Sequence, residues 1–220
     1  MWNCRSIVNK LDNFQSFVYS TSLNIIALSE TWLTDNVFDN EILPTNYTVY
    51  RSDRGSRGGG VMLCISSHIP SRLLQSHTTI DMVSVEVQTF PSIVFCCVYI
   101  PPKFTDDYLY LVLHSIESLS LQYSRLIVVG DFNAPDVEWS TLSASSHSSK
   151  LLCDVIFRCN LTQLITVPTH IHGNTLDLLF TNIDNYICNI STTINTTLLS
   201  DHYIIPVSYT HLTLPTKRIV

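Results

Sequence analysis

The apolar residues of this chain fall into short runs, and this pattern limits the folds that the chain can adopt. The runs are rich in Val, Ile, Leu, Tyr and Phe, and the longest extends from Ile93 to Ile100. A helix that crosses a membrane needs roughly 20 consecutive apolar residues, so this run is far too short to form one. Short apolar runs of this kind are typical of strands that are buried on both faces.

Helical segments interrupt these strands. Apolar residues recur at helical spacing over 7–20 and again around 151–156, and Thr105 followed by two acidic residues is a favourable helix start. Strands are expected over 23–29, 47–51, 61–66, 82–88, 93–99, 126–129, near 164, and over 176–180, 187–193 and 203–209. Strands interspersed with helices predict an α/β domain, in which two packed mixed sheets carry helices on their outer faces.

Length and cysteine content indicate one domain in a reducing compartment. The chain has 220 residues, which fits one large domain, and 45% of them are hydrophobic. The seven cysteines are an odd number and form no Cys-x-x-Cys pair, so we interpret them as structural thiols. No basic, apolar leader opens the chain, and we therefore expect an intracellular protein of the nucleus or cytoplasm, without a signal peptide.

Polar residues that could carry chemistry gather where predicted strands begin or end. These candidates are Glu30, Asp131, Asn133, Asp177 and His202. A hard divalent cation binds carboxylate oxygens, and an imidazole can exchange a proton near neutral pH. A carboxylate beside that imidazole would orient it through the other ring nitrogen. The set therefore contains the residue types that metal-dependent hydrolysis of a phosphodiester needs.

Each candidate also has a simpler structural interpretation when it is taken alone. A Glu at a strand end is usually a solvated loop residue, an Asp after Gly usually forms a turn, and Tyr99 by itself fits a core aromatic. The run Gly58–Gly60 is interpreted as a hairpin turn, because a phosphate-binding loop would precede a helix and Val61 opens a strand instead. His170 and His172 have no Cys at metal-ligand spacing, so a zinc site there is disfavoured.

The ordered set of motifs is more specific than any single residue. In chain order the motifs are Asn3-Cys4-Arg5-Ser6, Ser29-Glu30-Thr31-Trp32, Arg57-Gly58-Gly59-Gly60-Val61, Val98-Tyr99-Ile100-Pro101-Pro102, Gly130-Asp131-Phe132-Asn133-Ala134-Pro135, Thr175-Leu176-Asp177 and Ser200-Asp201-His202. Over about residues 2 to 207 they resemble the apurinic-type endonuclease domain of non-LTR retrotransposons, a member of the DNase I-like endonuclease/exonuclease/phosphatase superfamily. The resemblance implies a four-layered α-β-β-α sandwich that nicks target DNA and exposes a 3′ hydroxyl for reverse transcription. It implies no membrane and no small-molecule cofactor.

The resemblance also implies which residues bind the metal and the phosphate. Glu30 would be the principal ligand of Mg²⁺, or of Mn²⁺ in its place. Asn3 would lie at the same metal, and Asp201 would be a further carboxylate there. Tyr99 and Asn133 would contact the scissile phosphate.

The implied proton chemistry uses three further residues. Asp131 would assist proton transfer, and His202, paired with Asp177, would position the phosphate or act as the base. The net charge of −6 weakens the case for tight, sequence-independent DNA binding. However, 4 of the 18 acidic residues belong to the implied site, and the other 14 leave a net charge of −2 against 12 basic residues. The charge therefore does not exclude a metal-dependent nuclease.

Both ends of the chain depart from the family pattern. Family members carry more residues of the first strand before the Asn3 motif, so we expect a shortened first strand that gives Asn3 little support. Residues 1–208 are assigned to the endonuclease domain, whereas residues 209–220 match nothing expected and stay unassigned. Three interpretations remain open: an active DNA endonuclease, an inactive remnant of one, or another phosphoesterase of the same fold, such as an abasic-site endonuclease or a small-molecule phosphatase.

Overall fold

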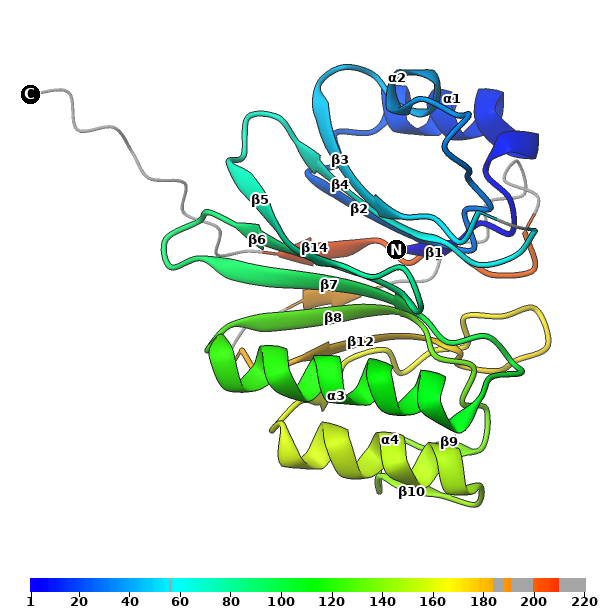
Figure 1. The fold of residues 1–220 in the computed structure, drawn as a ribbon, viewed down its shortest axis with the longest axis vertical. Coiled ribbons are helices and arrows are strands. Elements are labelled where there is room, and N and C mark those ends of the chain that lie inside the picture. The colour runs from blue at the N-terminus through cyan, green and yellow to red at the C-terminus, as the bar shows by residue number, and fades with distance from the viewer. Residues whose placement is uncertain (56, 184–187, 191–199, 210–220) are drawn as a thin grey trace, which may run out of the picture.

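The computed structural model describes residues 1–55, 57–183, 188–190 and 200–209, and it places two β-sheets face to face with helices on their outer faces (Figure 1). The smaller sheet has the strand order β1-β2-β4-β3. Its strands are β1 (Trp2–Asn3), β2 (Ile25–Ser29), β3 (Tyr47–Ser52) and β4 (Val61–Ser66). The helices on its outer side are η1 (Val8–Lys10), α1 (Leu11–Ser20) and α2 (Asp39–Ile42).

The larger sheet has six strands in the order β11-β12-β8-β7-β6-β5. They are β5 (Ser71–Ser76), β6 (Asp81–Val87), β7 (Ile93–Tyr99), β8 (Leu126–Asp131), β11 (Thr162–Gln163) and β12 (Asp177–Thr181). Its outer helices are α3 (Asp106–Gln122) and α4 (His147–Arg158). Two short antiparallel pairs are also described: β9 (Val137–Glu138) with β10 (Ser143–Ala144), and β13 (Cys188–Ile190) with β14 (Val207–Tyr209). The predicted α/β sandwich of two mixed sheets flanked by helices is confirmed.

Three apolar clusters lie between the four layers. On β7, Cys96 and Val98 face the cluster under α3 and α4, whereas Cys97 and Tyr99 face the cluster between the two sheets. A strand that is apolar throughout is therefore buried on both faces, as its composition predicts. The third cluster lies between the smaller sheet and α1, where Phe14 is almost fully buried.

Local signals explain where the two long helices begin. The Thr105 hydroxyl accepts a hydrogen bond from the Tyr108 amide at 3.2 Å and caps α3, as expected. The Ser146 hydroxyl caps α4 in the same way, which starts this helix earlier than its apolar residues suggest. The sequence pattern does not predict β5 or α2, because β5 is a largely exposed edge strand and α2 is a single turn.

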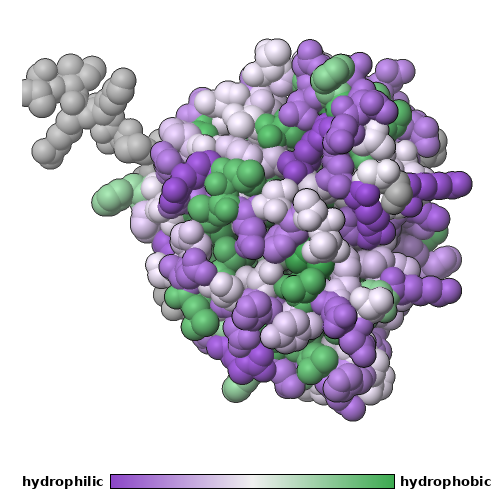
Figure 2. All heavy atoms as spheres, in the orientation of Figure 1, coloured by the Kyte–Doolittle hydropathy of each residue, from purple (hydrophilic) through white to green (hydrophobic). Residues whose placement is uncertain are grey.

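The described thiols lie in the interior, and the face of the surface drawn in Figure 2 is of mixed polarity. The cysteines whose side chains are described are buried and free, and burial raises the pKa of the Cys97 thiol to about 12. On the face drawn in Figure 2, hydrophobic side chains occur in small separate groups among hydrophilic ones. Among the described helices, none is long and apolar enough to span a membrane.

The first strand is short, but hydrogen bonds hold it on both sides. β1 pairs in parallel with the end of β2, where Asn3 lies opposite Ser29. On its other side, the Ile205 amide donates to the Met1 carbonyl at 2.9 Å, and the Ser200 hydroxyl donates to the Asn3 carbonyl at 2.8 Å. The expectation that Asn3 has little support is therefore wrong. Most of the unassigned tail, residues 210–220, lies outside the described residues.

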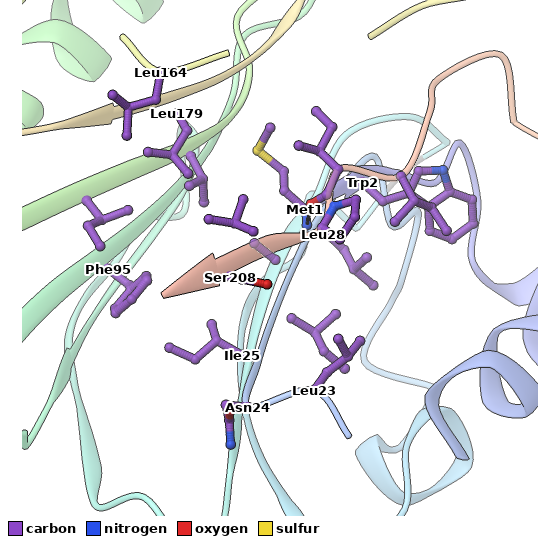
Figure 3. Close-up of a pocket in the computed structure, with 18 of the residues that line it drawn as sticks. Met1, Trp2, Leu23, Asn24, Ile25, Leu28, Phe95, Leu164, Leu179 and Ser208 are labelled. Atoms are coloured by element: carbon purple, nitrogen blue, oxygen red, sulfur yellow. Dashed lines mark hydrogen bonds between the residues drawn. The ribbon is translucent and has the colours of Figure 1, made fainter. Parts of the chain in front are cut away.

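A cavity of about 480 Å³ lies between the sheets beside Met1 (Figure 3). Its walls are largely apolar side chains from both sheets, among them Ile25 of β2, Phe95 of β7 and Leu179 of β12. None of the predicted site residues lines it. A site for phosphodiester chemistry must therefore be sought elsewhere.

Candidate active site

Four polar side chains form a row across the larger sheet at one end of its strands. The strand register pairs Asp81 with Tyr99, Tyr99 with Asp131, and Asp131 with Asp177. Side chains of directly paired residues lie on the same face of a sheet. Tyr99 packs into the cluster between the sheets, so this row faces the smaller sheet. The three aspartates are almost fully buried, which places costly charges at the edge of the core.

Asn3 connects this row to the smaller sheet. Its amide nitrogen donates to Glu30 Oε1 at 3.2 Å and to Asp131 Oδ2 at 2.8 Å. Its amide oxygen accepts a hydrogen bond from the Arg5 backbone amide at 3.1 Å, which fixes the orientation of the side chain. Asn3 therefore holds two carboxylates of different sheets close together, and in this arrangement its oxygen does not face them.

Glu30 lies in a tightly held loop that follows β2. Its φ of 52° and the φ of 55° at Trp32 are in the left-handed region, which side chains other than glycine seldom adopt. The Trp32 indole donates to Glu30 Oε2 at 3.2 Å. The Trp32 amide donates in turn to the Gly59 carbonyl at 3.0 Å, so the glycine run supports this loop. Strain of this kind is often found at functional sites.

His202 and Asp177 form a buried pair, as predicted. His202 Nδ1 lies 2.7 Å from Asp177 Oδ2, and His202 Nε2 lies 3.9 Å from Asp131 Oδ2. Burial lowers the pKa of His202, but the bond to Asp177 and the surrounding carboxylates outweigh it and raise this pKa to about 9. The imidazole is therefore positively charged at neutral pH. The Tyr203 amide donates to the Thr169 carbonyl at 2.8 Å, which anchors the segment that carries His202.

Burial also raises the pKa of two other residues in the row, Asp131 and Tyr99. Burial and the charge of Asp177 raise the pKa of Asp131 well above its ordinary value. Burial and the neighbouring Glu30 raise the pKa of the Tyr99 hydroxyl, which therefore stays protonated and can donate a hydrogen bond. The site thus offers a hydroxyl donor, a proton-holding carboxyl group and an imidazolium close together.

Asn133 and Asp201 lie at the site, but in different arrangements from those expected. β8 ends at Asp131 and Asn133 has a φ of 46°, so Asn133 lies in the turn after the strand. The Asn133 backbone amide donates to Asp131 Oδ1 at 3.0 Å, and the Asn133 side chain donates to the Ile100 carbonyl at 2.8 Å. Asp201 forms an ion pair with Arg5. Its described contacts do not include Glu30.

The structure also brings in a residue to which the sequence gave no role. The ring of His170 packs edge-on against that of His202, with centroids 4.7 Å apart, and its Nε2 lies 3.6 Å from Asp201 Oδ2. His172 is exposed; its backbone amide donates to His170 Nδ1 at 3.2 Å, and the two ring centroids are 5.0 Å apart. The His-x-His spacing alone does not distinguish these two histidines. Asp81, the register partner of Tyr99, was also missed from the sequence. The strand was predicted to begin at residue 82, whereas β6 begins one residue earlier.

The donor set fits a hard divalent cation. Asp131 and Asp177 offer carboxylate oxygens within 4.8 Å of one another, and Glu30 is linked to Asp131 through Asn3. Asp177 Oδ1 is buried without a described hydrogen-bond partner. Carboxylate oxygens at the edge of a core are the ligands that Mg²⁺ and Mn²⁺ prefer.

Residues 93–206, just over half of the chain, match the model of the endonuclease-reverse transcriptase family. The chain belongs to this family. The matched region contains Tyr99, Asp131, Asp177 and His202, whereas Asn3 and Glu30 precede it. No curated protein sequence matches the chain.

Solved structures of nucleases and a phosphatase share the fold of this chain. The endonuclease domain of TRAS1, a telomere-specific non-LTR retrotransposon, is similar with a TM-score of 0.71 and 16% identity over 96% of both chains. The 3′ phosphatase NExo from Neisseria, bound to a product DNA hairpin, has a TM-score of 0.73 and 14% identity over 96% of this chain and 98% of its own. An AP endonuclease from Archaeoglobus fulgidus has a TM-score of 0.66 and 17% identity over 94% and 96%. The fold is that of the DNase I-like endonuclease/exonuclease/phosphatase superfamily, which confirms the predicted resemblance.

Proposed function

We propose that this protein is a Mg²⁺-dependent endonuclease that hydrolyses a phosphodiester bond of DNA and nicks a target strand, as in retrotransposition. The observation that carries the proposal is the hydrogen-bonded network of Glu30, Asn3 and Asp131 beside the His202–Asp177 pair. This network joins both sheets at one edge, where a phosphate can approach. Membership in the endonuclease-reverse transcriptase family favours this substrate over a small phosphorylated molecule.

Glu30 is the proposed principal ligand of the metal. Asn3 orients the Glu30 and Asp131 carboxylates toward a shared position. When bound there, Mg²⁺ would neutralise charge on the phosphate and on the leaving oxygen. Asp201 forms an ion pair with Arg5, and its proposed role is to hold the Arg5 guanidinium at the rim of the metal site.

The phosphate is proposed to lie against three donors, Tyr99, Asn133 and His202. The Tyr99 hydroxyl is protonated and buried beside Glu30, so it can donate to a phosphate oxygen. The Asn133 backbone amide donates to Asp131, and its side chain, which is bonded to the Ile100 carbonyl, is proposed to orient the same group. The charged His202 ring, fixed by Asp177, would stabilise the negative charge that develops as water attacks phosphorus.

Asp131 is the proposed site of proton transfer. Its raised pKa suits a group that exchanges a proton near neutral pH. In the proposed reaction, the oxygen of water bonds to phosphorus and the bond from phosphorus to O3′ breaks. One proton leaves the water and one is gained by O3′, which yields a 3′ hydroxyl and a 5′ phosphate. His202 is then an electrostatic group, and the other role considered for it, that of a base, is not needed.

Conversion of supercoiled plasmid to nicked circles tests the proposal. Nicking is expected with Mg²⁺, and it should disappear with EDTA and in His202→Ala. His147→Ala is a matched control, because His147 is exposed at the start of α4, outside the site. A folded protein that does not nick would support the inactive remnant. Hydrolysis of small phosphate esters without nicking would support a phosphatase.

A further inference from the structure

Asp81 is a buried carboxylate for which the proposed reaction has no use. It is only 3% exposed, and it is the register partner of Tyr99. Its Oδ1 accepts a hydrogen bond from the Gly60 amide at 2.8 Å, and its Oδ2 accepts one from the Tyr108 hydroxyl at 2.9 Å. Because these contacts use both oxygens, Asp81 is rigidly held and is poorly placed to be a metal ligand.

Arg54 is the cation that Asp81 holds. Its Nε lies 3.3 Å from Asp81 Oδ1, and its Nη2 is bonded to Oδ2. The centre of the guanidinium lies 5.7 Å from the centroid of the Tyr99 ring. About a third of the side chain is exposed, and the described hydrogen bonds do not use Nη1. Arg54 is thus partly exposed beside the Tyr99 ring, with Nη1 donors that make no hydrogen bond to a described residue.

The glycine run provides the space for this arrangement. A Cβ at Gly59 would lie 2.4 Å from Cζ of Arg54, so any other residue there would displace the guanidinium. Gly58 has a similar positive φ of 93°, but a Cβ at Gly58 would have no atom within 4 Å. The run therefore forms more than a turn between β3 and β4, because it seats Arg54 against Tyr99 and Asp81.

We propose that Arg54 binds a backbone phosphate of the DNA strand next to Tyr99, and that Asp81 is its positioning residue. This inference rests on the proposed function, because it names a phosphate contact of the same substrate. An arginine suits this task, since its guanidinium can bond Asp81 on one edge and a phosphate on the other.

Binding of a fluorescent DNA duplex, measured by anisotropy with Ca²⁺ in place of Mg²⁺, tests the inference. Arg54→Gln is expected to weaken binding about tenfold and to lower the slope of log Kd against log salt by about one. Arg158→Gln is the matched control, because Arg158 pairs with Glu117 on the helical layer and loses the same charge. Its Kd and salt slope should remain those of the wild type.

Two further variants separate a lost phosphate contact from poor folding. Arg54→Gln combined with Asp81→Asn leaves no unpaired charge in the core, and it should weaken binding as much as Arg54→Gln alone. Gly59→Ala keeps Arg54 but displaces its guanidinium, so this variant should raise Kd severalfold. Gly58→Ala is its control, because it carries similar backbone strain without that contact, and its Kd should stay unchanged.

The outcomes distinguish this inference from the proposed function. If the wild type nicks DNA but Arg54→Gln and Gly59→Ala keep its Kd and salt slope, Arg54 is only part of a structural ion pair and the inference is wrong. If the wild type neither binds nor nicks DNA, the proposed function and the inference both fall. A weakened Kd with an unchanged salt slope would also overturn the inference, because a lost phosphate contact must lower that slope.

Discussion

Replacement of Asp177 by Asn tests whether this buried carboxylate keeps His202 charged. His202 Nδ1 and Asp177 Oδ2 are 2.7 Å apart, and the two side chains are 7% and 0% exposed, so water cannot replace the lost partner. The amide has almost the same shape but no charge, and its NH₂ group favours the opposite imidazole tautomer. Because burial remains and lowers the pKa of His202, we expect this pKa to fall from about 9 to below its ordinary value of 6.5.

The size of the effect follows from the pKa of His202. The difference between 6.5 and about 9 corresponds to about 3 kcal/mol, at about 1.4 kcal/mol for each pKa unit. Since the folded protein holds this proton more tightly, the stabilisation is present below pH 6.5 and is lost as the pH rises through about 9. Asp131 acts in the same direction, because burial and Asp177 raise its pKa and the folded state loses stability as this carboxyl ionises. The Asn variant should therefore differ most from the wild type below pH 6.5.

Two measurements check this prediction. NMR titration of the His202 ring gives its pKa directly, and urea unfolding across the same pH range gives the free energy of unfolding of both proteins. Asp201→Asn is the control, because it removes the same charge. Among the groups that raise the pKa of His202, the Asp201 carboxylate has the smallest effect, so the ring should still titrate near pH 9 in this variant. The argument is refuted if His202 of Asp177→Asn also titrates near pH 9, or if the stability difference does not change with pH.

Three further predictions concern the metal, the cavity and the larger sheet. Glu30→Ala should reduce nicking at least about a hundredfold and abolish calorimetric Mn²⁺ binding without lowering the melting temperature, and Mn²⁺ binding at wild-type affinity would disprove its role as ligand. Ala27→Val adds methyl groups to a wall of the cavity and should raise the free energy of unfolding in urea by about 1 kcal/mol; a loss of stability would show that the cavity cannot accept them. A Cβ at Gly130 would lie 1.8 Å from the Val98 carbonyl oxygen, so Gly130→Ala should cost about 3 kcal/mol or more in the same assay, and a wild-type transition midpoint would contradict this close approach.

Most of the fold was predictable because its signals are local. Runs such as 93–99 and 126–129 are apolar throughout, which is typical of strands buried on both faces, and the Thr105 cap marks the start of α3. The errors have local causes as well. β5 is a largely exposed edge strand without an apolar run. The first turn of α4 is rich in serine, so apolar periodicity does not mark where this helix begins.

The residues of the candidate site were predictable only as a set. Glu30, Tyr99, Asp131 and His202 each have a simpler interpretation, and their order along the chain is what indicated a phosphodiesterase. The structure brings them to one edge of the sandwich. Their catalytic roles stay predictions until the variants are measured.

The sequence by itself determined the helices α1, α3 and α4, most of the strands, the sandwich architecture and the motif residues, because periodicity, caps and motif order are written along the chain. Only the tertiary structure decided which atoms face one another. It turned the Asn3 amide nitrogen toward two carboxylates, paired Asp201 with Arg5, and seated Arg54 between Gly59 and Asp81. These contacts depend on strand register and on the packing of two sheets, which join residues far apart in the chain.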